Sequence, residues 1–272
     1  MKELDLKELM DVELETMKQI HKICIEQGFK YSLSGGTLLG AIRHKGFIPW
    51  DDDIDIFMPR ADYDKFIDYC KNNSTPFNLL CTQTNENYKY LFAKATAKNT
   101  ILFEEFCDRK GVDMGVYIDI FPIDDLGESY DEAIKLFKKT RFRRELLVAK
   151  NWKSFTRSKT HSLKYEPIRF AFYLLSRFIS AKAIIKSLTK DIYAKREMTS
   201  QFSGTIFTTY REKEIMPKQV FEEYILVPFE DAEFMATKEW DTYLTKIYGN
   251  YMQLPPEEKR VTHHTFKAYY KD

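Results

Sequence analysis

The sequence contains few cysteines, no long apolar run and no low-complexity tract. Its four cysteines are irregularly spaced and include no Cys-x-x-Cys pair, so we expect neither a disulfide framework nor a zinc site of that kind, but reduced thiols in the cytosol. A run of about 18 apolar residues is absent, which argues against a transmembrane helix. Residues 1–20 are acidic and amphipathic without an apolar core, so we expect no secretory signal.

The chain also has almost no net charge, because 42 basic residues offset 41 acidic ones. The two kinds are unevenly distributed. Residues 1–134 contain 15 basic and 25 acidic residues, whereas residues 135–196 contain 18 basic and 3 acidic residues. Such asymmetry is typical of proteins that bind a charged ligand, nucleic acid or an anionic membrane. A 44% hydrophobic content excludes intrinsic disorder.

Helical and strand patterns are interspersed in the first 125 residues, which predicts an α+β fold (α/β-like), a mixed sheet flanked by helices. We expect residues 1–128 to form the catalytic core and residues 129–272 a mainly helical, basic half, with both packed as one unit. The expected helices cover 6–27 (ended by Gly28), 37–42, 63–72, two parts of 129–200 around a loop at 151–166, and 240–248. The expected strands cover 31–34, 53–56, 91–95, 101–104 and 116–124, the last closed by a proline.

The strongest chemical signal is an acidic strand. Asp53 and Asp55 alternate with Ile54 and Ile56, which places two carboxylates on one strand face. Like charges so close together cost stability unless a cation neutralises them, and hard carboxylate oxygens suit Mg²⁺ or Mn²⁺. Asp119 lies in a later apolar strand, where a structural role for a charge is hard to find.

A glycine pair precedes this strand. Gly35 and Gly36 form an expected turn before a helix that starts at Thr37, and such a turn offers backbone N–H groups to a phosphate. Together with the carboxylates, it predicts a metal-dependent site for phosphoryl or nucleotidyl transfer.

The acidic segment has two other interpretations. A solvated acidic loop accounts for Asp51 and Asp52 about as well as a functional role does. A calcium-binding loop would use Asp51, Asp53 and Asp55 as its first, third and fifth positions. However, Ile56 stands where that loop requires glycine.

The same residues resemble the LicD family of the nucleotidyltransferase-fold superfamily, to which fukutin-type transferases are distantly related. The resemblance rests on Ser34-Gly35-Gly36-Thr37-Leu38-Leu39-Gly40-Ala41-Ile42-Arg43-His44, Ile48-Pro49-Trp50-Asp51-Asp52-Asp53-Ile54-Asp55-Ile56, Tyr117-Ile118-Asp119-Ile120-Phe121-Pro122, Phe229-Glu230, Tyr248-Gly249-Asn250-Tyr251-Met252, Leu254-Pro255-Pro256, Arg260 and His263. It spans nearly the whole chain, and Asn250 departs from the Asp expected there.

The resemblance implies transfer of a phospho-alcohol from a CDP-activated donor to a sugar hydroxyl, with release of CMP. Phosphocholine from CDP-choline is the family's best-known cargo, and its acceptors are lipid-linked or oligosaccharide precursors of teichoic acid or lipopolysaccharide. Composition does not single out choline over ribitol, and the 41 aromatic residues (17 Tyr, 21 Phe, 3 Trp) are too many to pick out a choline cage.

On this basis a hypothetical site can be assigned. Asp53 and Asp55 would hold Mg²⁺ or Mn²⁺, and Asp119 would complete the metal site and accept the proton of the attacking hydroxyl. Backbone N–H groups of Gly35, Gly36 and Thr37 would hold a donor phosphate. Arg43 and Lys94 are candidates for phosphate contacts and equally for ordinary surface charges. The resemblance favours a binding role for His263, and a structural role is as plausible.

The basic middle contains the most apolar run of the chain, residues 167–179, which is flanked by Lys and Arg. Residues 167–190 are interpreted either as a helix in a membrane interface or as an ordinary core helix. A membrane role would place the protein in the cytoplasm, peripherally on the inner face of the plasma membrane.

Competing functions differ in how much of the sequence they explain. A glycosyltransferase also uses Asp-x-Asp with a metal, but it lacks the upstream Gly-Gly and helix. A nucleic-acid adenylyltransferase is compatible with the fold, although nucleic acid is not the expected partner. A non-enzymatic membrane- or nucleic-acid-binding module leaves Asp53, Asp55 and Asp119 unexplained.

Overall fold

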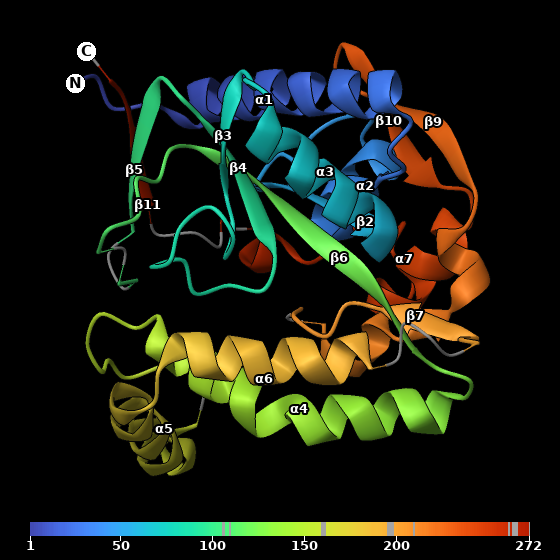
Figure 1. Ribbon diagram of the computed structural model, residues 1–272. Helices are drawn as coiled ribbons and strands as arrows, with labels where there is room; N and C mark the ends of the chain where they lie inside the picture. The colour runs from blue at the N-terminus through green and yellow to red at the C-terminus, as the bar shows by residue number, and fades with distance from the viewer. Residues whose placement is uncertain are drawn as a thin grey trace.

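The computed structural model describes residues 1–104, 107–108, 110–158, 162–194, 199–208, 210–260, 262 and 266–271. Its centre is a mixed β-sheet with the strand order β1-β2-β6-β4-β3 (Figure 1). These strands are β1 (Ser32–Leu33), β2 (Ile54–Pro59), β3 (Phe77–Leu80), β4 (Ala93–Ala97) and β6 (Tyr117–Gly127). β2 and β6 run parallel, and the other pairs are antiparallel. The mixed sheet with its helices confirms the predicted α+β class.

Strand β6 is eleven residues long and continues past its partners β2 and β4. Its second half pairs with β7 (Phe202–Gly204), and β7 pairs with β8 (Met216–Pro217). Through this pairing the central sheet extends into the second half of the chain.

The first three helices pack against the sheet (Figure 1). They are α1 (Leu6–Gln27), α2 (Gly35–Arg43) and α3 (Arg60–Asn72). The Asp5 side chain accepts the N–H of Glu8, and the Glu8 side chain accepts the N–H of Asp5, so both orphan donors at the start of α1 are satisfied. Gly28 ends α1 with a φ of 68°, which confirms the predicted C-cap.

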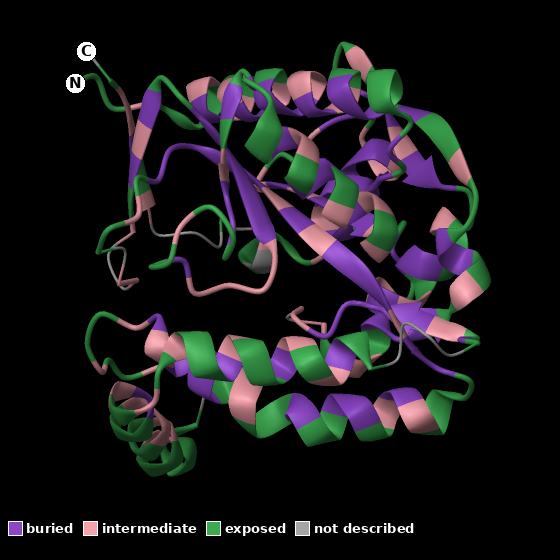
Figure 2. Cartoon of the chain, viewed as in Figure 1, coloured by how far each residue is buried: buried purple, intermediate pink, exposed green. Residues whose placement is uncertain are grey.

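The next three helices form a separate layer, which lies below the sheet in Figure 1. They are α4 (Tyr130–Lys150), α5 (Glu166–Phe178) and α6 (Ala181–Tyr193), with a short 3₁₀ turn, η1 (Leu163–Tyr165), before α5. α4 packs against both α5 and α6. In Figure 2 the buried residues follow the sheet strands, whereas α5 is mostly exposed.

The last segment returns to the sheet and contributes to its core. It comprises η2 (Arg211–Glu214), η3 (Lys218–Phe221), the hairpin β9 (Tyr224–Phe229) and β10 (Ala232–Thr237), α7 (Trp240–Tyr248), η4 (Glu257–Lys259), and β11 (Phe266–Tyr270), which pairs with β5 (Thr100–Glu104). The main hydrophobic core joins side chains of α1, β1 and β2 to Phe229, Phe234 and Tyr243. Strands β7 to β11 were not predicted from the sequence, whereas α7 was.

Two local predictions were wrong. Gly35 and Gly36 are the first residues of α2 and not a turn ahead of it, because Ser34 is the N-cap. Pro122 lies inside β6 and does not close it. It falls between the last pairing with β4 at Ile120 and the first pairing with β7 at Asp124, so on that edge its missing N–H breaks no ladder hydrogen bond.

Candidate functional site

Three neighbouring strands bring the predicted carboxylates together. The parallel register of β2 and β6 places Asp55 beside Asp119, and the antiparallel register of β4 places Lys94 on the other side of Asp119. Asp53 is two residues before Asp55, so extended backbone places the two side chains on the same face. Asp51, Asp53, Asp55 and Asp119 all line one cleft of about 650 Å³. The structure therefore assembles the acidic set that the sequence predicted, from strands 64 residues apart in the chain.

This crowding disturbs the ionisation of Asp55. Burial raises the pKa of Asp55 well above its usual range, and the charges of Asp53 and Asp119 raise it further. The ammonium group of Lys94 acts in the opposite direction and forms an ion pair with Asp119. A site that raises the pKa of a carboxyl by like-charge repulsion is one that a cation would stabilise.

Lys94 is held in place behind Asp119. Its side chain is 3% exposed, and its Nζ lies 3.4 Å from the centroid of the Tyr117 ring. Lys94 is not among the residues that line the cleft. It therefore contacts the site through Asp119, which differs from the direct phosphate contact that the sequence suggested.

The donor set suits a hard divalent cation in one specific way. Within the described ranges, no three His, Cys, Asp or Glu side chains stand close enough to form a metal-binding cluster by themselves. Mg²⁺, however, is usually bound through one or two carboxylates together with substrate phosphates and water. Asp53 and Asp55 at the edge of the cleft fit that mode, and a calcium loop, which needs six or more protein-provided oxygens, fits less well.

The start of helix α2 lies against the acidic residues. A Cβ added to Gly36 would lie 2.5 Å from Oδ2 of Asp51, so a larger residue here would displace the Asp51 carboxylate. Gly35 has a φ of 49° and donates its N–H to the hydroxyl of Tyr243 at 3.3 Å. Both glycines line the cleft, as expected of a phosphate-binding helix start.

The position of Thr37 differs from the one it would need to hold a donor phosphate with its backbone N–H. Its hydroxyl accepts the N–H of Asp55 at 2.9 Å, and the residue is 4% exposed. Thr37 is not part of the cleft lining. Its side chain fixes the start of β2 against α2, and it thereby positions Asp55.

Glu214 and Tyr210, which the sequence did not mark, both line the cleft. Glu214 of η2 is buried, accepts the hydroxyl of Thr208 at 3.0 Å, and lines the cleft. Burial raises the pKa of Glu214 to about 7. Beside it, Tyr210 and Tyr248 are hydrogen-bonded through their hydroxyls. No local motif marks Glu214, and only the tertiary packing reveals it.

Helix α4 and the segment 205–208 also line the cleft. Arg144 donates from Nη1 to the carbonyl of Ile206 at 2.8 Å and from Nη2 to that of Phe137 at 2.9 Å. Its Nε is buried and has no hydrogen-bond partner among the described residues. Arg144 is thus a fixed cation on the cleft wall with one unused donor.

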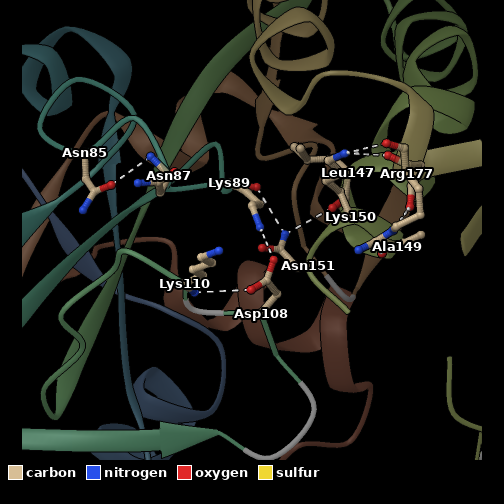
Figure 3. A network of polar contacts seen from close by, with 11 residues as sticks. Asn85, Asn87, Lys89, Asp108, Lys110, Leu147, Ala149, Lys150, Asn151 and Arg177 are labelled. Atoms are coloured by element: carbon tan, nitrogen blue, oxygen red, sulfur yellow. Dashed lines mark hydrogen bonds and ion pairs between the residues drawn. The ribbon is translucent and has the colours of Figure 1, made fainter. Parts of the chain in front are cut away.

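Lys89 and Asn151 close one end of this wall. Lys89 forms an ion pair with Asp108 at 2.7 Å, and Asn151 donates to the carbonyl of Lys89 at 3.3 Å (Figure 3). The backbone N–H of Asp108 donates to the carbonyl of Asn151 at 2.7 Å. These bonds tie the segment before β4 to the end of α4.

Aromatic side chains cover part of the cleft. Tyr90 and Phe92 have ring centroids 5.1 Å apart, and Phe92 and Phe121 lie 4.5 Å apart. Phe207 lines the cleft as well. Among the described aromatic residues, Tyr90, Phe92, Phe121, Phe207 and Tyr210 line this cleft.

The remaining predicted residues lie elsewhere. Arg43 is outside the cleft lining and donates from Nη1 to the carbonyl of Tyr251 at 2.7 Å, so it ties the end of α2 to the C-terminal segment. Asp52 is buried and does not line the cleft, in contrast to Asp51. His263 lies outside the described residues.

A comparison with protein families gives one match over this region. The family described as LicD/FKTN/FKRP, nucleotidyltransferase domain, matches residues 28–165, which include α2, β2, β4, β6 and the whole of α4.

Individual relatives give a consistent result. The lipopolysaccharide cholinephosphotransferase LicD of Haemophilus influenzae is 33% identical over 275 residues, covering 99% of this chain and 99% of that protein. The human ribitol 5-phosphate transferase FKRP is 45% identical over 42 residues, which are 15% of this chain and 8% of that protein. An uncharacterized protein of Rickettsia prowazekii is 46% identical over 48 residues, 18% of each chain.

Proposed function

Because this chain belongs to the LicD family and is a phosphotransferase of that family, we propose that it transfers phosphocholine from CDP-choline to a sugar hydroxyl of a cell-surface glycan precursor. The nucleotide released from the donor is CMP. The acceptor is a lipid-linked or oligosaccharide precursor of the lipopolysaccharide or teichoic acid type, which the enzyme meets on the cytoplasmic face of the membrane.

One observation carries the proposal. The carboxylates of Asp53, Asp55 and Asp119 and the glycine start of α2 line the same cleft, together with the cationic side chains of α4 and the segment before β4. Negative groups that hold a metal, and N–H groups and cations that hold phosphates, are the two parts that transfer from a diphosphate donor requires.

Different residues of the cleft bind different parts of the donor. Asp53 and Asp55 would hold Mg²⁺ or Mn²⁺, which would supply positive charge to stabilise the diphosphate and the departing CMP. The N–H group of Gly36 would bind a phosphate oxygen, and the positive charge of Arg144 on the cleft lining would attract the diphosphate. The N–H of Gly35 already donates to the Tyr243 hydroxyl. Arg43 does not bind the donor phosphates in this mechanism, because it lies outside the cleft.

In the transfer one bond forms, one bond breaks and one proton is transferred. The sugar oxygen bonds to the phosphorus that carries choline, the bond from that phosphorus to the CMP oxygen breaks, and the hydroxyl proton passes to a carboxylate. Asp119 is the acceptor that the sequence suggested, but its pairing with Lys94 stabilises its charged form and weakens it as a base. Glu214, whose pKa is raised to about 7, is a second candidate.

The aromatic part of the cleft supports choline as the cargo. A quaternary ammonium group binds to aromatic faces by cation–π attraction, which contributes roughly 0.5–2 kcal/mol per contact. Tyr90, Phe92 and Phe121 lie side by side in the cleft and can provide such faces. A polyol such as ribitol has no positive charge and gains no cation–π attraction from them.

A donor panel tests the proposal. The protein is incubated with Mg²⁺ and a glycan acceptor, and with CDP-choline, CDP-ribitol, a UDP-sugar or ATP in parallel, and the released nucleotide is identified. We expect CMP from CDP-choline, and its loss when EDTA removes the metal. UDP release would indicate a glycosyltransferase, and pyrophosphate release from ATP would indicate an adenylyltransferase.

A second pair of variants separates the two proton acceptors. If Glu214 takes the proton, Glu214→Gln removes the rise of kcat around pH 7 while Asp119→Asn retains that rise at a lower level. The reverse pattern would assign the proton to Asp119.

A further inference from the structure

Helix α5 has its apolar side facing solvent. Every residue of α5 that is exposed is apolar, namely Pro167, Ile168, Phe170, Ala171, Leu174, Leu175 and Phe178. Phe178 is 86% exposed and Ile168 is 56% exposed, while Ser176 is the one buried residue of the helix. An amphipathic helix of a globular protein normally has the opposite orientation.

The polar side chains of α5 contact the end of α4, the residue Trp152 after it, and one another. Arg177 donates to the carbonyl of Ala149 at 2.5 Å, and Lys150 donates to the carbonyl of Ser176 at 2.7 Å (Figure 3). Arg169 forms an ion pair with Glu166 at 2.7 Å and lies over the Trp152 ring. The orientation of α5 is therefore fixed by specific bonds, which leave its apolar face outward.

The exposed face is large and continuous. The seven exposed residues fall on one side of the helix, which is about 20 Å long at 1.5 Å per residue. Leu163 and Tyr165 of η1, both exposed, extend the face at its start. In Figures 1 and 2, α5 lies at the outer corner of the helical layer, remote from the sheet, and is largely exposed.

The basic residues around α5 indicate which kind of surface covers this face. Residues 135–196 contain 18 basic and 3 acidic residues, and the side chains of Lys153, Lys164, Lys182 and Lys186 near α5 are exposed. A contact between two copies through α5 would bring two strongly basic regions together. An anionic bilayer attracts each such lysine by about 1 kcal/mol and accepts an apolar helix face at the level of its head groups.

We propose that the apolar face of α5, with η1, docks the protein onto an anionic membrane surface. The sequence suggested a membrane contact through 167–190 as one of two interpretations. The structure narrows this to α5, because Ile184, Leu188 and Ile192 of α6 are buried. Since α4 both packs on α5 and lines the cleft, docking brings the cleft next to the lipid surface where a lipid-linked acceptor lies.

Flotation of the full-length protein with vesicles tests this surface, and needs no substrate, so it is independent of the proposed reaction. The wild type is mixed at low salt with vesicles of phosphatidylglycerol and phosphatidylcholine, or of phosphatidylcholine alone. We expect flotation with the anionic vesicles and at least a tenfold loss of bound protein in the variant Phe170→Ser, Leu174→Ser, Phe178→Ser.

A matched control replaces three exposed apolar residues elsewhere, Ile25, Leu226 and Met252, by serine. It should float as the wild type does, and both variants should retain the wild-type circular dichroism. A wild type that does not float, or an α5 variant that floats unchanged, would overturn the proposal. A lipid-free dimer that the α5 variant converts to monomer would assign the face to a second copy instead.

A single-site reporter adds a second measurement. Phe178→Trp should show a blue-shifted tryptophan emission on addition of the anionic vesicles, relative to the wild-type signal. An unshifted emission would contradict insertion of this face.

Discussion

At the scale of single residues, the site depends on groups whose charge the fold shifts. Asp55 and Glu214 are both buried, and the pKa of each is raised, in Asp55 with help from Asp53 and Asp119. The two residues line one cleft. In the proposed function, Asp55 would hold the metal and Glu214 would be a candidate to accept the proton.

Glu214 predicts a pH dependence of stability. Its pKa is about 7 in the folded protein and near 4.5 without burial, so the folded state binds more protons between these values. The associated stability is fully present below pH 4.5 and is lost as the pH rises through 7, with a limit of roughly 3 kcal/mol.

Urea unfolding of wild type and Glu214→Gln at several pH values measures this effect. The difference between the two free energies of unfolding isolates Glu214 from Glu13 and Asp55, whose pKa values are also raised. We expect the wild type to lose stability relative to the variant between pH 4.5 and pH 7. Parallel curves would mean that Glu214 titrates normally.

At the scale of elements, α2 and β2 act as one unit. Thr37 on α2 accepts the N–H of Asp55 on β2, and the N–H of Ser34 donates to the carbonyl of Asp55 at 2.9 Å. Thr37→Val keeps the shape but leaves a buried N–H unsatisfied, which should destabilise the protein by about 1–3 kcal/mol and lower kcat.

Thr37→Ser is the matched control, because it restores the hydroxyl. Thermal unfolding and CMP release should both return toward the wild-type values in this variant. If Thr37→Val and Thr37→Ser behave alike, the hydrogen bond does not position Asp55.

The same scale shows what the sequence can predict. The acidic strand and the C-cap of α1 at Gly28 were predicted, because alternation and capping are local signals. Glu214 was not predictable, since its burial results from Thr208 and Tyr243 around it. Strand β9 was missed because its sequence is apolar throughout, so it shows no apolar–polar alternation, and because it contains Pro228, which argues against a strand.

At the scale of the molecule, we expect the two halves to unfold together. The sequence suggested residues 1–128 and 129–272 as units packed on one another, and the main core contains Ile54 and Ile56 together with Phe229 and Tyr243. A core that mixes the two halves predicts one cooperative transition. Calorimetry should give one peak, with calorimetric and van't Hoff enthalpies equal. Two resolved peaks would indicate independent halves.

The central claim is that the carboxylates of β2 act in phosphotransfer. The most direct test compares CMP release from CDP-choline, with Mg²⁺ and a glycan acceptor, by the wild type, Asp55→Asn and Asp68→Asn. Asp68 is a control on the exposed side of α3, with its side chain 66% exposed. We expect Asp55→Asn to lose at least about 10²–10³-fold in kcat, while its thermal stability is not reduced, because the repulsion with Asp53 and Asp119 is relieved. Asp68→Asn should behave as the wild type. CMP release by Asp55→Asn at the wild-type rate would contradict the account.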